Sequence, residues 1–171
     1  MENRKLNFWH TLMALKFSPE ARQRADEILS RYPENQKKAA VVPLLHLAQD
    51  EWGYVSPEAM ACVAELLDCT PVKVAEIATF YPMYNKQPVG KYDVQVCHTL
   101  PCALTGCAEI LSYVSEKLNL HTGETSPDGK FTLKKAECLA ACDRGPVMFV
   151  NKTLHTNLTP AKIDSILDSL E

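Results

Sequence analysis

Two pairs of cysteines constrain the fold of this chain more than any other feature. Four residues separate Cys97 from Cys102, three separate Cys138 from Cys142, and thirty-five lie between the pairs. Each pair follows a β-prone segment, so each is expected in a loop where a strand ends. If the two strands are parallel, both loops leave the same edge of the sheet, where open α/β sheets generally bind ligands. The spacing therefore predicts four thiols that meet at one edge.

The second half of the chain predicts a compact α/β fold. Residues 91–97 alternate and are β-prone, residues 101–118 are helical, and "SPDGKFTLKKAEC" is a turn that leads into a strand. The segments "PVMFV" and "KTLH" flank Asn151 and Lys152 as a hairpin, and a last helix follows. The order β-α-β-β-β-α implies a parallel pair joined by a right-handed crossover, with antiparallel strands added by the hairpin. We expect a sandwich of thioredoxin-like type.

The first half predicts a helical bundle. Ser-Pro or Thr-Pro pairs, which are typical helix starts, occur at residues 18, 56, 70 and 159. Apolar residues with helical spacing follow the pairs at 56 and 70 and predict buried faces: Met60, Val63, Ala64 and Leu67; Val74, Ile77, Ala78 and Tyr81. The pair at 159, in the second half of the chain, is followed by a similar stripe: Ile163, Ile166, Leu167 and Leu170. We divide the chain into an N-terminal arm (residues 1–17), a helical bundle domain (18–85) and the α/β domain (86–171), an α+β/α/β architecture overall.

Composition excludes several classes of protein. The net charge of −3, with no run of Lys and Arg, argues against nucleic-acid binding. The longest apolar stretch, residues 39–48, is too short to span a membrane and contains Pro43 and His46. His46 is expected to pack within the bundle. The N-terminus lacks the pattern of a secretory signal, so we expect a reducing compartment, where seven cysteines favour thiols or metal ligands over disulfides.

The cysteine spacing by itself leaves the ligand open. Two pairs suit one zinc ion, the two irons of a [2Fe–2S] cluster, or redox disulfides, although zinc sites more often have two intervening residues. His98 adjoins Cys97, but a Rieske centre needs two histidines on one iron, and the other histidines lie in unrelated segments. Cys107 lies about 140° around a helix from Cys102. It is therefore expected to face away from the loop, in the apolar stripe that continues with Ile110, Leu111, Val114 and Leu118.

Two long segments carry a family resemblance: "IATFYPMYNKQPVGKYDVQVCHTLPC" and "GETSPDGKFTLKKAECLAACDRGPVMFVN". From about residue 18 to residue 171 the chain closely resembles the E-type chain of bacterial NADH:quinone oxidoreductase, the small [2Fe–2S] protein of the NADH-oxidising module of respiratory complex I. The resemblance implies that Cys97 and Cys102 hold one iron, and Cys138 and Cys142 the other, in a thioredoxin-like [2Fe–2S] ferredoxin domain. Ala140 departs from the family pattern, which usually has glycine there.

The resemblance also implies a role and partners. The chain would exchange single electrons with flavin mononucleotide (FMN) on a larger NADH-binding partner, the F-type subunit, and would have no complete active site of its own. It would lie in the cytoplasm, peripheral to the inner membrane, as part of the complex. The alternatives are the equivalent subunit of an NAD-linked hydrogenase or formate dehydrogenase, and a zinc-stapled structural adaptor. A thioredoxin-like thiol oxidoreductase would need a C-x-x-C pair, which the sequence lacks.

Overall fold

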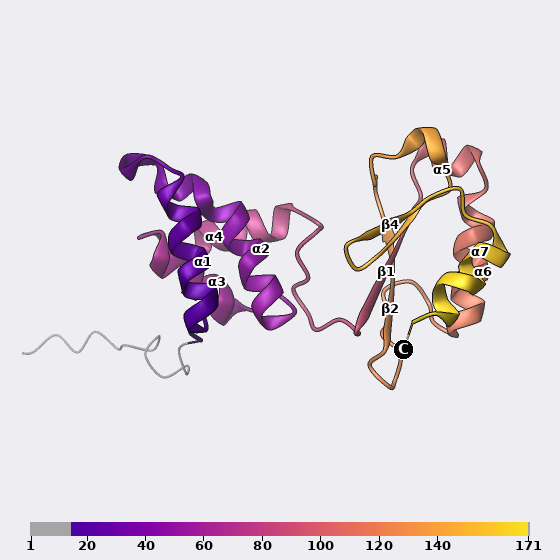
Figure 1. Ribbon diagram of the computed structural model, residues 1–171, viewed down its shortest axis with the longest axis horizontal. Coiled ribbons are helices and arrows are strands. Elements are labelled where there is room, and N and C mark those ends of the chain that lie inside the picture. The colour runs from indigo at the N-terminus through magenta and orange to yellow at the C-terminus, as the bar shows by residue number, and fades with distance from the viewer. Residues whose placement is uncertain (1–14, 171) are drawn as a thin grey trace, which may run out of the picture. The chain divides into compact units, whose positions relative to one another are not determined.

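The computed structural model describes residues 15–170, and the chain divides into two compact units between Pro88 and Val89 (Figure 1). The sequence-based boundary is at residues 85 and 86. Most of the expected N-terminal arm, residues 1–14, lies outside the described residues. The end of the arm packs against the first unit, because the ring of Phe17 stacks on that of Trp52 with the ring centres 4.6 Å apart.

The described part of the first unit contains helices and no strand. Its elements are α1 (Pro19–Ser30), the 3-10 helix η2 (Glu34–Ala40), α2 (Val41–Trp52), α3 (Pro57–Leu66) and α4 (Pro71–Phe80). The Ser/Thr-Pro pairs start α1, α3 and α4 as predicted. The hydroxyls of Ser18 and Ser56 accept hydrogen bonds from first-turn amides at 3.2 and 3.1 Å, which satisfies donors that have no partner within the helix.

The core of this unit confirms one predicted stripe and corrects another. The apolar stripe of α3 is buried as expected. In α4, Val74 and Ala78 are buried, but Tyr81 is 38% exposed because the helix ends at Phe80 and Tyr81 has an extended backbone. Tyr84 enters the core instead, and its hydroxyl donates to the carbonyl of Val42 at 2.9 Å.

The expectation that His46 packs inside the bundle is wrong. Its side chain is exposed on α2, although its ring is tilted against that of Tyr84 with the ring centres 5.0 Å apart. The neighbours Leu45 and Leu47 point into the core. An apolar run on a helix must place some members on the outer face, and His46 occupies that position.

The second unit is a four-stranded mixed sheet with helices. Its elements are β1 (Tyr92–Cys97), α5 (Leu100–Leu104), α6 (Cys107–Leu118), β2 (Phe131–Ala136), the 3-10 helix η3 (Cys142–Arg144), β3 (Met148–Val150), β4 (Thr153–His155) and α7 (Pro160–Asp168). The strand order is β2-β1-β3-β4. As predicted, β1 and β2 are parallel and the β3–β4 hairpin is antiparallel. The single helix predicted over residues 101–118 is instead two, separated at Gly106, whose φ is +90°.

The core of the second unit lies between the sheet and the helices α6 and α7, which pack side by side in Figure 1. Alternate residues of the strands meet apolar residues of both helices, and the fully buried set is Val94, Val96, Val114, Leu133, Met148 and Ile163. The predicted stripe of α7 is confirmed, since Ile163 and Leu167 are buried and Ile166 and Leu170 pack beside them. Because alternate strand residues must face the helices, the core fixes the register of the strands. The register in turn fixes which residues stand at the edge where the loops begin.

Among the helices described for residues 15–170, none is long and apolar enough to cross a membrane.

We predict that Tyr84→Phe lowers the free energy of unfolding by about 0.5–1.5 kcal/mol, because the bond to the Val42 carbonyl is lost while the ring stays buried. Tyr84→Ala also removes the ring and should cost about 3–5 kcal/mol. Urea unfolding of both variants measures these differences. Equal stability of wild type and Tyr84→Phe would show that the hydroxyl contributes nothing, and Tyr81→Phe is the control because Tyr81 is partly exposed.

Candidate functional site

The register of β1 and β2 brings the two cysteine loops to one edge of the sheet, as expected. Cys97, the last residue of β1, pairs with Ala136, the last residue of β2. The amide of His98 donates to the carbonyl of Ala136 at 3.1 Å, and the amide of Cys97 donates to the carbonyl of Val147 at 3.1 Å. Both loops therefore start from backbone positions that hydrogen bonds hold in place.

The first pair is buried. Cys97 and Cys102 are each 1% exposed, the first at the end of β1 and the second in α5. Burial raises the pKa of Cys97, but hydrogen bonds from the Thr99 hydroxyl and from the backbone of Thr99 and Leu139 outweigh it, so the pKa lies below its usual value. Burial and the adjacent Cys97 raise the pKa of Cys102 to about 11. Cys97 is therefore the thiol of this pair that ionises first.

The second pair is exposed. Cys138 lies in the loop after β2, and Cys142 begins η3. Desolvation, followed by the charge and a hydrogen bond of Cys138 and the charge of Cys97, raises the pKa of the Cys142 thiol. The sulfur of Cys97 lies 3.7 Å from the carbonyl oxygen of Glu137, the residue before Cys138. The two loops thus lie against each other, one pair beneath the surface and the other on it.

Two further contacts at this edge were not expected from the sequence. Thr99 is the N-cap residue of α5, yet its hydroxyl makes no cap bond and lies 3.3 Å from the sulfur of Cys97. Nε2 of His98 lies 3.5 Å from a carboxylate oxygen of Glu137, so an ion pair joins the loops beside the thiols when His98 is protonated. A threonine two residues after a candidate ligand was the available signal for the first contact. The second joins distant segments, and no local pattern marks it.

The prediction for Cys107 is confirmed in one respect and wrong in another. Cys107 is 4% exposed and belongs to the apolar core, as expected. It does not face away from the loop: it lies in one small apolar cluster with Cys97, Cys102, Ala141 and Val147. The calculation of 140° assumed an unbroken helix, whereas α5 ends at Leu104 and α6 begins at Cys107.

No three His, Cys, Asp or Glu side chains within residues 15–170 converge closely enough to form a site for one metal ion. The four thiols lie instead as a buried pair and an exposed pair in adjoining loops.

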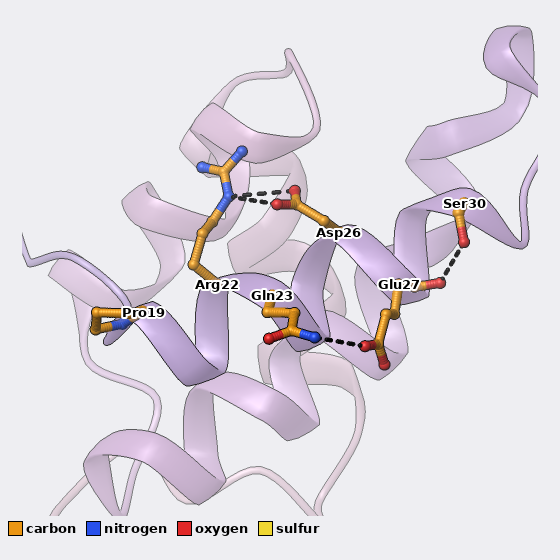
Figure 2. Close-up of a pocket in the computed structure, with 6 residues that line it drawn as sticks. All are labelled: Pro19, Arg22, Gln23, Asp26, Glu27 and Ser30. Carbon is orange, nitrogen blue, oxygen red and sulfur yellow. Dashed lines mark hydrogen bonds and ion pairs between the residues drawn. The ribbon is translucent and has the colours of Figure 1, made fainter.

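A shallow hollow lies elsewhere, on the outer face of α1 (Figure 2). Its lining residues all belong to that helix: Pro19, Arg22, Gln23, Asp26, Glu27 and Ser30. They bond mainly to one another, with Nε of Arg22 3.2 Å from Oδ1 of Asp26 and Nε2 of Gln23 3.3 Å from Oε1 of Glu27. Such pairs are typical of an exposed helix surface, and we assign the hollow no function.

The chain is similar in sequence to proteins with known names. The chain is 39% identical over 156 residues to "NADH dehydrogenase [ubiquinone] flavoprotein 2, mitochondrial" of Dictyostelium discoideum, covering 91% of this chain and 63% of that protein. It is 41% identical over 147 residues to the E-type chain of the NADH-quinone oxidoreductase of Rickettsia bellii, covering 85% of this chain and 88% of the relative. The chain therefore spans less than two thirds of the first relative and most of the second.

Solved structures and a family model complete the comparison. An air-oxidised NAD+-reducing [NiFe]-hydrogenase superposes with a TM-score of 0.66 at 18% identity, over 76% of this chain and 22% of the hydrogenase chain, which shows a shared fold. The family model described as "Thioredoxin-like [2Fe-2S] ferredoxin" matches residues 25–171. The chain belongs to the family of thioredoxin-like [2Fe–2S] ferredoxins.

Proposed function

We propose that this chain is the [2Fe–2S] electron-carrier subunit of the NADH-oxidising module of an NADH:quinone oxidoreductase. The observation that carries the proposal is the pair of cysteine loops at one sheet edge, in a chain 41% identical to a protein named as the E-type chain of that oxidoreductase. The chain contributes to an oxidoreductase as a subunit and holds no complete active site by itself.

The residues at the edge fit such a cluster. Thiolates are the usual ligands of iron–sulfur clusters, and two pairs match two irons. Gly145 brings backbone against the buried pair, because a Cβ there would lie 3.6 Å from the sulfur of Cys102 and 2.7 Å from Oγ1 of Thr105. The distance to Cys102 is an ordinary contact, but the distance to Thr105 is too short, so a larger residue at position 145 would require Thr105 or the loop to move.

In the proposed arrangement Cys97 and Cys102 hold one iron, and Cys138 and Cys142 hold the other. When bound, a [2Fe–2S] cluster accepts and releases one electron at a time. Two hydrogen bonds would stabilise negative charge on the ligands. One joins the Thr99 hydroxyl and the sulfur of Cys97, and the other runs from the amide of Ala140 to the sulfur of Cys138. The apolar cluster around the buried pair excludes water. This loss of solvation opposes added negative charge on the site.

The proposed partner is the FMN- and NADH-binding subunit, as a heterodimer that joins the rest of the complex on the cytoplasmic side of the inner membrane. Electron exchange requires close approach, and the exposed thiols Cys138 and Cys142 lie on the accessible side of the site. Leu100 and Leu104, which flank Cys102 in α5, are 71% and 80% exposed. Apolar residues exposed beside a redox site suit a surface that a protein partner covers.

The equivalent subunit of an NAD-linked hydrogenase or formate dehydrogenase is the second candidate, favoured by the structural similarity to the hydrogenase. Purification of the tagged chain from its own cells separates the candidates. Recovery of NADH:quinone reductase activity with the chain supports the first. Recovery of hydrogen- or formate-dependent NAD+ reduction without quinone reductase activity supports the second.

The cluster itself is tested by anaerobic purification, iron, zinc and sulfide analysis, and electron paramagnetic resonance. We expect iron and sulfide in the ratio of a [2Fe–2S] cluster, no signal in the oxidised protein, and the signal of one unpaired electron after reduction with dithionite. One zinc per chain with no signal in either state would instead identify a structural adaptor.

We predict that Cys97→Ala and Cys138→Ala each abolish cluster assembly, whereas Cys107→Ala retains it. All three variants remove one sulfur, and Cys107 is the matched control because it is buried beside Cys97 and Cys102. Iron and sulfide analysis of the folded variants measures the difference. Equal loss of iron in all three variants would contradict the exclusion of Cys107 from the cluster ligands.

We predict that Gly145→Ala lowers cluster retention by about tenfold or more, because the added methyl group meets Oγ1 of Thr105 and forces the loop away from Cys102. Thr105→Ala removes the obstructing oxygen, so the double variant should recover much of the loss. Absorbance decay with excess iron chelator gives the rates. Unchanged retention in Gly145→Ala would show that the close approach is not needed.

A further inference from the structure

The loop between Cys138 and Cys142 contains a backbone conformation that alanine rarely adopts. Ala140 has a φ of +54°. The other non-glycine residues with positive φ in the described part of the chain are Asp68, Asn119, Asn151 and Asn157. Asp and Asn tolerate the left-handed region because their short polar side chains bond locally, whereas the methyl group of alanine crowds the backbone carbonyl. Ala140 is therefore the strained member of this set.

This conformation is linked to the exposed thiol pair. The amide of Ala140 donates to the sulfur of Cys138 at 3.4 Å. Two residues later, the thiol of Cys142 lies within hydrogen-bonding reach of Cys138. Ala140 is itself exposed, so no tight side-chain packing explains why its backbone is held there. Strained backbone persists where the surrounding geometry requires it, most often at functional sites.

We propose that Ala140 is a positioning residue for the cluster: its left-handed backbone brings Cys138 and Cys142 together and directs its own N–H to the sulfur of Cys138. This inference rests on the proposed function, in which these thiols hold one iron. Opening of the loop lets alanine return to a preferred conformation, so the strain favours opening. The exposed half of the site is thus the half that releases the cluster first.

A series of substitutions at position 140 tests the strain. Cluster retention should fall as the residue at position 140 tolerates the left-handed region less well. The expected order, from highest to lowest retention, is Ala140→Gly, Ala140→Asn, wild type, Ala140→Val. We expect the half-life of the cluster absorbance under excess iron chelator to be about fivefold to tenfold longer for Ala140→Gly than for wild type. The thermal midpoint of the apoprotein should rise by about 2–4 °C.

Ala161→Gly is the matched control, because Ala161 is exposed in α7 and glycine is unfavourable within a helix. The same chemical change should there lower the thermal midpoint and leave the cluster half-life unchanged. A rise in half-life for both glycine variants would attribute the effect to general flexibility and overturn the proposal.

A second readout isolates the hydrogen bond. Replacing Ala140 with lactic acid by nonsense suppression turns its amide into an ester, which removes the N–H and keeps the methyl group. Fewer donors to a ligand sulfur make the reduced state less favourable, so the reduction potential should become more negative. The same replacement at Ala161 should not shift it. A purely structural role of Ala140 would leave the potential unchanged.

The outcomes separate the two proposals. A wild-type chain that carries no iron and sulfide overturns the proposed function and this inference with it. A wild-type chain with its cluster, together with variants of unchanged half-life and potential, overturns the role of Ala140 alone and leaves the four-cysteine assignment in place.

Discussion

The parallel pairing of β1 with β2 is the constraint on which the rest of the site depends. It aligns Cys97 with Ala136, so that both cysteine loops begin at the same edge. The register is anchored in the core by Val94 and its partner Leu133, neither of which is exposed. A slip of one residue would turn these apolar side chains to the other face of the sheet. The same slip would also displace one cysteine loop relative to the other.

The two cysteine pairs have opposite surroundings, one buried and one exposed. Cys97 and Cys102 lie in an apolar cluster, where an unpaired thiolate is costly. Hydrogen bonds from Thr99 and Leu139 offset this cost at Cys97. Cys138 and Cys142 are exposed, so water or a partner protein can reach them. The fold thus encloses one pair of thiols and leaves the other pair accessible.

The sequence predicted features that depend on local chemistry. The Ser/Thr-Pro pairs start their helices, and Asn151 lies in the β3–β4 turn with a positive φ. Two predictions failed where a helix ended earlier than its periodicity suggested, and a third failed because His46 lies on the exposed face of α2. Tyr81 is partly exposed and Tyr84 is buried because α4 ends at Phe80. Cys107 contacts the other thiols because the helix is interrupted at Gly106. Angular arithmetic holds only within one uninterrupted helix.

The sequence by itself determined the order of the strands and helices apart from the break at Gly106, and it placed the two cysteine pairs after strands. Turn residues, helix caps and alternation act over a few neighbouring positions, which is why they can be read locally. Only the tertiary structure decided that the first cysteine pair is buried and the second exposed, that Cys107 shares the apolar cluster of the first pair, and that the backbone of Leu139 reaches Cys97 from the other loop. Burial and hydrogen bonding of a thiol depend on segments that are distant along the chain. Folding brings those segments together, and no local pattern encodes their contacts.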